Sequence, residues 1–354
     1  MTRVNCISSV VASHEIGSEE MGSFLAIHAP DGVRTRLQRM VASSGNRTRY
    51  AVLPLDELAR LNGAGERGDL YREHAVKIGE RAIAGLADIG ALRPETISTV
   101  ICVSSTGWAA PSIDTRLVRR FDLRPYCRRI PLAQLGCGGG VAALSLAAEI
   151  VSRDPDQRVL IVSVELPSLQ LQLGEPSYAE LLAAAQFGDG AAAAIVSNDD
   201  VGLQVVGTGS VLLPETEEGG RILFSETGLR LVASSGLPAL IRSRVRQVVD
   251  ACASRHQVDG RALSFVVAHP RGSAVLDAVG EGLSLDRSTL AASWTAWERS
   301  GNMVSASIYR ALAELVRGDP PRDEELGMLL AFGTGVACEM TLVRWGSGPT
   351  VFYA

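Results

Sequence analysis

The sequence predicts an α/β protein whose sheets are largely covered by helices. Short runs rich in β-branched residues and bounded by Gly, Pro or Ser are typical of buried strands. Helix-like segments lie between these runs, and such alternation is typical of sheets with helices on their faces. The expected strands span residues 98–105, 158–166, 191–197, 264–270 and 327–335.

Four segments favour helices. Residues 66–86 are polar and periodic, and residues 237–253 and 302–316 are amphipathic. Residues 138–152 are apolar almost all round, which predicts a buried helix. The most loop-like interior segment is 214–226.

A polar turn at residues 197–200 divides the chain into unequal halves. We therefore expect an N-terminal half at 1–198 and a C-terminal half at 199–354. Each half contains a strand that leads into a Gly-containing turn and then a helix.

Composition limits the class of protein. The chain has 354 residues, of which 46% are hydrophobic, and its net charge is only −5, so nothing indicates a nucleic-acid surface. No apolar run is long enough to span a membrane, and the first residues lack the pattern of a signal peptide. Six scattered cysteines without a CxxC pair predict reduced thiols and no zinc site. We expect a cytoplasmic protein with no membrane or nucleic-acid partner.

The stretch "QLGCGGGVAALSLA", residues 134–147, places Cys137 between an extended segment and the start of the buried helix. A thiol at a helix N-terminus faces free N–H groups and the positive end of the dipole, which lowers its pKa. The glycines would let a substrate carbonyl approach the backbone closely. The alternative is a small buried cysteine at a glycine-rich helix contact.

Two further residues complete a candidate Cys/His/Asn set. His269 ends the strand "LSFVVAHP", where α/β enzymes often place functional groups, although it could equally be a hydrogen-bonded core residue. Asn302 follows a glycine at an apparent helix start, so it is either an N-cap or an amide donor for a developing oxyanion. The other four histidines lie among polar or charged residues, which favours surface positions.

Five longer motifs resemble the chalcone and stilbene synthase family, the type III polyketide synthases. They are "PLAQLGCGGGVAAL", "AAAQFGDGAAAAIVS", "VVAHPRGSAVLDAVGEGL", "ERSGNMVSASI" and "LLAFGTGVACEMTLVRW". The matches run in order from about Arg36 to Trp345, and "STGWAAPSI" and "LIVSVE" are most similar to the bacterial branch that includes tetrahydroxynaphthalene synthase. The resemblance implies a thiolase-like fold with two related halves stacked in five α-β-α-β-α layers, normally as a homodimer.

The resemblance also implies an activity. An acyl-CoA or malonyl-CoA starter would be loaded on Cys137 and extended by decarboxylative condensation with malonyl-CoA. A cyclised polyketide such as a pyrone, a resorcinol or another phenolic would then be released. His269 would hold the thiolate as an ion pair and, with Asn302, would donate hydrogen bonds to the thioester oxygen as CO2 leaves. The family needs no metal, flavin or nicotinamide cofactor.

Three positions match other functional sites of the family. Phe187 in "QFGDG" matches an aromatic gatekeeper beside the cysteine, although a core phenylalanine is the plainer interpretation. Arg36 and Arg39 match basic positions that meet the CoA phosphates, a role that suits arginine, although both could be ordinary surface residues. A third basic position of that segment is Ser43 here.

The chain departs from the family pattern around the expected pocket. Leu231 replaces a second gatekeeper Phe, Ile222 a cavity-lining Gly, and Val304 a pocket Ser. Ser105 stands where the naphthalene-forming branch often has Cys. We expect an apolar, reshaped pocket, with Ile222 and Val304 narrowing it and Leu231 widening its neck.

Two further departures flank the cysteine. Thr334 replaces the proline of the plant motif "GFGPG", and Gly138 replaces a plant Phe. The second exchange predicts a gap beside Cys137.

Other classes remain open at this point. A ketosynthase III-like enzyme or acyltransferase would use the same triad, but it normally carries "HQAN" and "GNTS", whereas this chain has "AHPRG" and "SGNMV". A degradative thiolase needs a second catalytic Cys in a late Gly-rich loop, a context that Cys338 lacks. A catalytically idle scaffold is disfavoured by the complete triad.

Overall fold

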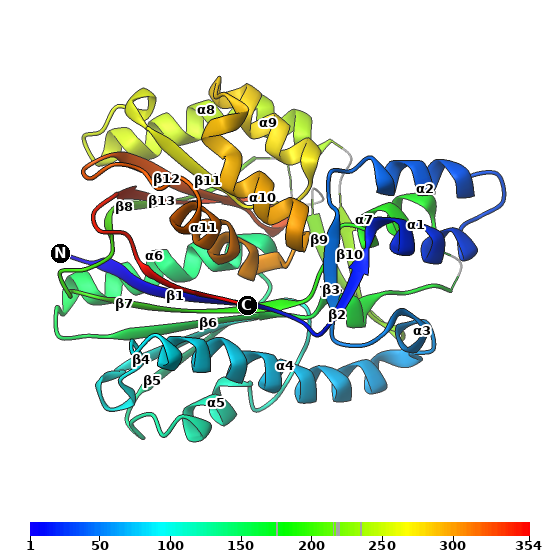
Figure 1. Cartoon of the computed structure of the whole chain (residues 1–354), viewed down its shortest axis with the longest axis horizontal. Helices are drawn as coiled ribbons and strands as arrows, with labels where there is room; N and C mark the ends of the chain where they lie inside the picture. The colour runs from blue at the N-terminus through cyan, green and yellow to red at the C-terminus, as the bar shows by residue number, and fades with distance from the viewer. Residues whose placement is uncertain (175, 215, 217–219, 234–235) are drawn as a thin grey trace.

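The computed structural model of the chain describes residues 1–174, 176–214, 216, 220–233 and 236–354 (Figure 1). Its strands are β1 Arg3–Val11, β2 His14–Gly17, β3 Thr48–Ala51, β4 Thr99–Val103, β5 Arg128–Leu132, β6 Val159–Glu165, β7 Gly190–Ser197, β8 Leu203–Leu212, β9 Gly220–Ser225, β10 Gly228–Ala233, β11 Phe265–Ala268, β12 Leu326–Phe332, β13 Ala337–Arg344 and β14 Thr350–Tyr353. Its helices are α1 Ser18–Ile27, α2 Arg34–Ala42, α3 Leu55–Leu58, α4 Gly63–Asp88, α5 Asp114–Arg120, α6 Gly139–Arg153, α7 Tyr178–Ala184, α8 Leu237–Arg255, α9 Ser273–Leu283, α10 Ala291–Ser300 and α11 Ser307–Arg317.

Hydrogen bonds connect the main strands into one ten-stranded sheet. Its order is β11-β12-β13-β8-β1-β7-β6-β4-β5, and β14 pairs parallel to β1. The pairing pattern occurs twice: β4 is parallel to β6, which is antiparallel to β7, and β11 is parallel to β12, which is antiparallel to β13. The two patterns meet where β1 pairs with β8 at only Arg3 and Val4. Two related halves are therefore present, as the resemblance implied.

The elements stack in five alternating layers (Figure 1). Helices α4 and α5 cover one outer face, α6 and α11 lie between the two parts of the sheet, and α8 and α9 cover the other outer face. This confirms the predicted α-β-α-β-α arrangement. The predicted division between residues 198 and 199 falls in the turn between β7 and β8.

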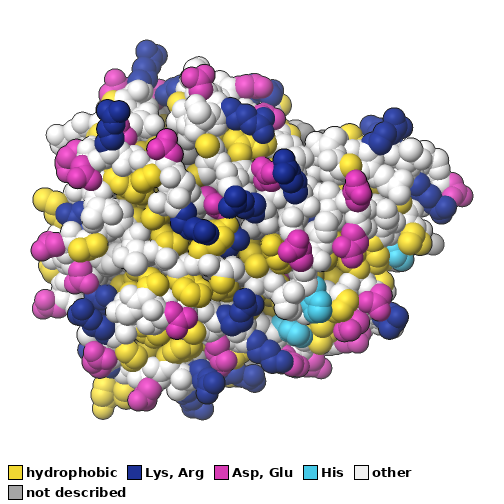
Figure 2. All heavy atoms as spheres, in the orientation of Figure 1, with side chains coloured by type: hydrophobic (Ala, Val, Ile, Leu, Met, Phe, Trp, Pro, Cys, Tyr) yellow, Lys and Arg dark blue, Asp and Glu magenta, His cyan; other side chains and the backbone are white. Residues whose placement is uncertain are grey.

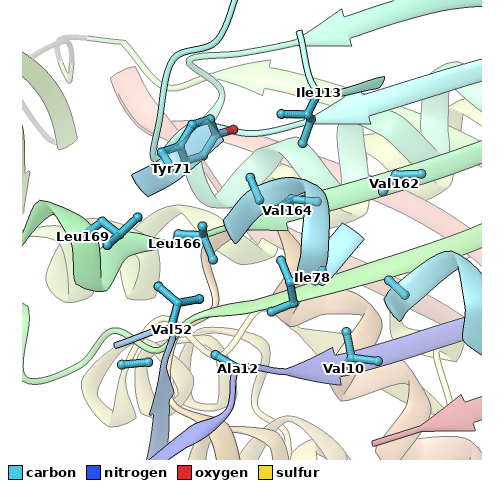
Figure 3. Close-up of a cluster of buried hydrophobic side chains, with 14 of the residues drawn as sticks. Val10, Ala12, Val52, Tyr71, Ile78, Ile113, Val162, Val164, Leu166 and Leu169 are labelled. Atoms are coloured by element: carbon cyan, nitrogen blue, oxygen red, sulfur yellow. The ribbon is translucent and has the colours of Figure 1, made fainter. Parts of the chain in front are cut away.

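Strand β6 shows why the sheet is apolar on both faces. Its residues alternate, so that Val162 and Val164 face the outer layer with Ile78 of α4, whereas Ile161 faces the central layer. Figure 3 shows the outer side of this packing, with Tyr71 and Ile78 close to the valines of β6. A strand buried on both faces gives a continuous apolar run, and that run is what identified it in the sequence.

The predicted strands are all present, and three of the predicted helices match α4, α6 and α8. Two expectations were wrong. Helix α11 begins at Ser307, after a 3₁₀ turn at Val304–Ala306, rather than at Asn302. The segment 214–226 contains strand β9 in its described part, because it pairs with β10 as a hairpin. The four histidines expected at the surface, His14, His28, His74 and His256, are half-buried.

The surface is of mixed charge. Basic and acidic side chains are interspersed over the face shown in Figure 2. In the described part of the chain, no helix is long and apolar enough to cross a membrane.

Candidate active site

Cys137 lies in a short 3₁₀ turn, Gly136–Gly138, immediately before α6 in the central layer. Its side chain is buried. The glycines that follow it allow close helix packing: a Cβ on Gly139 would lie 2.7 Å from Val103 Cγ1, and one on Gly140 would collide with the Ser305 carbonyl oxygen. Gly139 therefore lets α6 pack closely against β4, and Gly140 lets it pack against the backbone of the Asn302 segment.

The predicted gap at Gly138 is absent. A Cβ there would lie 3.2 Å from both Glu339 Cγ and Gly333 Cα, so the neighbouring loop already fills this space. Thr334 of the same loop donates its hydroxyl to the Gln134 carbonyl at 2.6 Å. It also donates its N–H to the Leu135 carbonyl at 3.4 Å, a bond that proline could not make.

Asn302 is brought to the sulfur of Cys137. Its side-chain amide lies 3.9 Å from Cys137 Sγ. Its backbone pairs with the Phe187 segment, because Asn302 N–H donates to Gln186 O at 2.8 Å and Gly188 N–H donates to Asn302 O at 3.0 Å. Asn302 Oδ1 accepts the N–H of Val304 at 2.9 Å, so Nδ2 is the atom of this amide that donates towards the sulfur.

His269 follows β11 and is held by the same loop. Its Nε2 lies 2.8 Å from the Val304 carbonyl oxygen, to which it donates, and its buried Nδ1 has no hydrogen-bond partner in the described structure. Val304 thus connects His269 to Asn302. It does so at a φ of +48°, a left-handed conformation that is rare for a β-branched residue. Strain of this kind persists where the surrounding structure enforces it, often at functional sites.

The protonation of this pair differs from the sequence prediction. Burial raises the pKa of the Cys137 thiol, although the charge of Arg271 and the Asn302 amide act in the opposite direction. Burial likewise lowers the pKa of His269 to about 4. Desolvation therefore disfavours both the thiolate and the imidazolium, and it acts in the opposite direction to the helix N-terminus.

Glu165 is a buried acidic residue beside the cysteine that the sequence analysis missed. Its carboxylate accepts hydrogen bonds from Ser105 N–H at 3.0 Å, from the Thr106 hydroxyl at 2.7 Å and from the Ser305 hydroxyl. Burial raises its pKa to about 7. The sequence does contain a clue to Glu165, because it is a charged residue at the end of the apolar run "VLIVSVE".

Ser105 is one of the predicted pocket residues, and it also supports the cysteine turn. Its hydroxyl accepts the N–H of Gly136 at 2.9 Å. Ser105 and Ile222 line a cavity of about 380 Å³. Phe187 lines a second cavity, of about 350 Å³, with Ala184 and Pro167.

The remaining pocket predictions have different outcomes. Val304 is buried and contributes its backbone to the triad, as described above. The side chain of Leu231 lies outside the described residues. Leu229, which is also in β10, lines the cavity of Ser105 and Ile222 and was not predicted.

The two expected CoA contacts lie on α2, at the surface. Arg36 stacks over the ring of Tyr178 at 5.1 Å, and Arg39 is exposed. Helices α1 and α2 project from the layered body at one end of the molecule (Figure 1). Among the described residues, no group of three or more His, Cys, Asp or Glu side chains could hold a metal ion.

Comparisons with known proteins agree with this geometry. The family model "Chalcone and stilbene synthases, N-terminal domain" matches residues 16–200, and the corresponding C-terminal model matches residues 204–345. A 1,3,6,8-tetrahydroxynaphthalene synthase of Streptomyces peucetius subsp. caesius is 33% identical over 97% of this chain and 93% of its own length. A phloroglucinol synthase of Pseudomonas fluorescens is 28% identical over 96% of this chain and 98% of its own.

A solved structure also has the same fold. The 1,3,6,8-tetrahydroxynaphthalene synthase of Streptomyces coelicolor A3(2) superimposes with a TM-score of 0.93 at 29% identity. The superposition covers 97% of this chain and 99% of that chain. The chain therefore belongs to the chalcone and stilbene synthase family, the type III polyketide synthases.

Proposed function

We propose that this enzyme loads an acyl-CoA or malonyl-CoA starter on Cys137, extends it with malonyl-CoA and releases a cyclised polyketide such as a pyrone, a resorcinol or another phenolic. The observation that carries the proposal is the Asn302 amide, 3.9 Å from the Cys137 sulfur at the start of α6. A thiol beside a fixed amide donor suits an enzyme that forms a thioester and then stabilises an enolate.

Loading requires the thiolate of Cys137. The thiol proton of Cys137 passes to Nδ1 of His269, the ring nitrogen without a partner, and the thiolate attacks the acyl-CoA carbonyl. The acyl–sulfur bond to Cys137 forms, the bond to CoA breaks, and CoA leaves as a thiolate. The proton stays on His269, so that Nδ1 becomes a donor for the next step.

Extension then uses the two donors. As malonyl-CoA loses CO2, the released electron pair forms an enolate, and the negative charge gathers on the thioester oxygen. Asn302 Nδ2 and His269 Nδ1 donate to that oxygen. The enolate carbon attacks the acyl carbonyl on Cys137, and the Cys137 thiolate leaves, ready to accept the lengthened chain.

The ketosynthase III-like alternative uses the same triad but differs in substrate. Arg36 and Arg39 favour CoA thioesters as the substrates, because both lie on the exposed side of α2, where their guanidinium groups could bind the phosphates of CoA. We expect Arg36→Ala and Arg39→Ala to raise KM for malonyl-CoA with little change in kcat. Arg60→Ala, at an exposed position just after α3, should leave both unchanged. Activity only with carrier-protein thioesters would favour the alternative.

The direct test is product analysis. The protein is incubated with malonyl-CoA, with and without a panel of acyl-CoAs, and product masses are read. We expect polyketide masses that differ by whole extension units, and we expect Cys137→Ser to form no acyl-enzyme by intact mass. An adduct of the same mass on Cys137→Ser would contradict the assignment of the nucleophile, and unchanged biological output from Cys137→Ala would support an idle scaffold.

We also propose that the enzyme is a cytoplasmic homodimer with no cofactor and no membrane or nucleic-acid partner. All six cysteines are free and buried, which supports a reducing compartment. Strand β5 ends the ten-stranded sheet with largely exposed residues, and Tyr126 just before it is 94% exposed. Such an edge is suited to pairing with a second copy. Light scattering in solution tests the dimer, which a monomeric mass would contradict.

A further inference from the structure

The hairpin of β9 and β10 lies between two cavities, one lined by Ser105 and the other by Phe187. Leu229 and Ile222 line the cavity of about 380 Å³, whereas Thr227 and Arg230 line the cavity of about 350 Å³ that reaches Phe187. The hairpin is a two-stranded sheet of its own and is not part of the ten-stranded sheet. Its position therefore depends on contacts other than strand pairing with the main sheet (Figure 1).

Two glutamine side chains supply those contacts to Leu229. Gln170 Oε1 accepts the N–H of Leu229 at 3.1 Å, and Gln172 Nε2 donates to its carbonyl oxygen at 3.1 Å. A neighbouring β-strand would satisfy the same two backbone groups. Gln170 ends a 3₁₀ turn, Pro167–Gln170, and Gln172 lies just beyond it, so that the two amides together take the place of a neighbouring strand.

The segment that carries the two glutamines is itself fixed. Buried Arg67 of α4 donates to the Leu169 carbonyl at 2.5 Å, and Ser168 N–H donates to Asp189 at 2.8 Å. Gln170 Nε2 donates to the carbonyl of Thr106, whose hydroxyl is bound to Glu165. Hydrogen bonds thus connect the hairpin, through Gln170 and Thr106, to Glu165 in the active site.

We propose that Gln170 and Gln172 are specificity-determining positioning residues: they fix β10 between the two cavities and so set the room available to the growing polyketide. The inference rests on the proposed function. Leu229 is the residue through which they act, because its backbone is held and its side chain lines the cavity with Ser105. Displacing β10 enlarges one cavity at the expense of the other.

The test compares variants that lose one bond to Leu229 with a variant of the same hairpin that keeps both. Gln172→Glu keeps the length of the side chain and its acceptor for the Thr227 hydroxyl, at 2.6 Å, but loses the donor to Leu229. Gln170→Ala removes the acceptor for the Leu229 N–H. The matched control is Glu226→Gln, at an exposed position in the turn of the same hairpin that lines neither cavity.

Two readouts are compared. Hydrogen–deuterium exchange of peptides from 220–233 should be faster by up to about tenfold in Gln172→Glu and Gln170→Ala, the effect of losing one hydrogen bond. The ratio of products with different numbers of malonyl units should change by about threefold or more, while the rate of Cys137 acylation stays within about twofold of wild type. Glu226→Gln should match wild type in both.

Several results would overturn the inference. Unchanged hydrogen exchange in both glutamine variants would show that the two glutamine bonds do not hold β10. Faster exchange with an unchanged product ratio would show that these bonds hold β10 but do not set specificity. A loss of Cys137 acylation, or an equal change in Glu226→Gln, would assign a general structural role instead. If the wild-type protein makes no product from any CoA ester, the proposed function fails. The hydrogen-exchange experiment still tests whether the two glutamines hold β10.

Discussion

Ionisation of Glu165 should weaken this fold as the pH approaches neutrality. Burial raises the pKa of Glu165 from 4.5 to about 7, although three hydrogen bonds favour the carboxylate. A group with a raised pKa in the folded state stabilises that state fully below the pKa of the unfolded chain. The contribution is lost as the pH rises towards the folded pKa. At 1.36 kcal/mol per pKa unit, the loss between pH 4.5 and pH 7 is about 3 kcal/mol.

Glu165→Gln isolates this effect. The amide keeps the shape of the side chain and an oxygen that accepts the Ser105 N–H, but it does not titrate. For a chain of 354 residues, about 3 kcal/mol corresponds to about 4 °C in Tm. We therefore expect the variant to gain about 4 °C relative to wild type when the pH is raised from 4.5 to 8.

The assay is thermal unfolding of both proteins at matched concentration across this pH range. Glu57→Gln, at an exposed position of α3, is the control and should show a constant Tm difference from wild type. A Tm difference between Glu165→Gln and wild type that does not change with pH would refute the reasoning. It would mean that the carboxylate is as well solvated by its hydrogen bonds as it is in the unfolded chain.

Other predictions concern the triad, the packing of α6 and the substrate. Asn302→Ala should lower malonyl-CoA decarboxylation by about 10²–10³-fold, as expected for one lost oxyanion donor, and a loss under tenfold would contradict that role. Gly140→Ala should destabilise the fold by about 1–3 kcal/mol because its Cβ meets the Ser305 carbonyl, whereas Gly65→Ala, in open space on α4, should be neutral or stabilising in the same urea titration. Because burial raises the thiol pKa, the rate of Cys137 alkylation by iodoacetamide should keep rising above pH 8 in the unliganded protein, and an inflection below pH 7 would indicate a preformed ion pair. The apolar pocket residues predict faster turnover with fatty acyl-CoA than with coumaroyl-CoA, and the reverse order would refute this preference.

The layered architecture was predictable because it is encoded in short stretches. A strand buried on both faces, such as β6, must be apolar at every position, and a helix between two sheets, such as α6, must be apolar all round. Cys137, His269 and Asn302 were found for a related reason: each stands at the end of such an element, next to a turn. The motifs around them then indicated the family.

The tertiary structure decided what depends on residues distant in sequence. The thiol pKa is raised rather than lowered because the central layer buries Cys137, and no local pattern contains that desolvation. Gly138 leaves no gap, because Gly333 and Glu339 of the other half fill the space. Hydrogen bonds across the fold likewise place Glu165 beside the cysteine.

The sequence alone therefore determined the fold class, the family and the three residues of the triad, because periodicity and motif spacing are local properties. Only the tertiary structure decided the protonation of the site, the two cavities and the hairpin between them. These depend on burial and on bonds such as that from Gln172 to Leu229, which join segments 57 positions apart. Pairings of this kind are set by the folded chain as a whole.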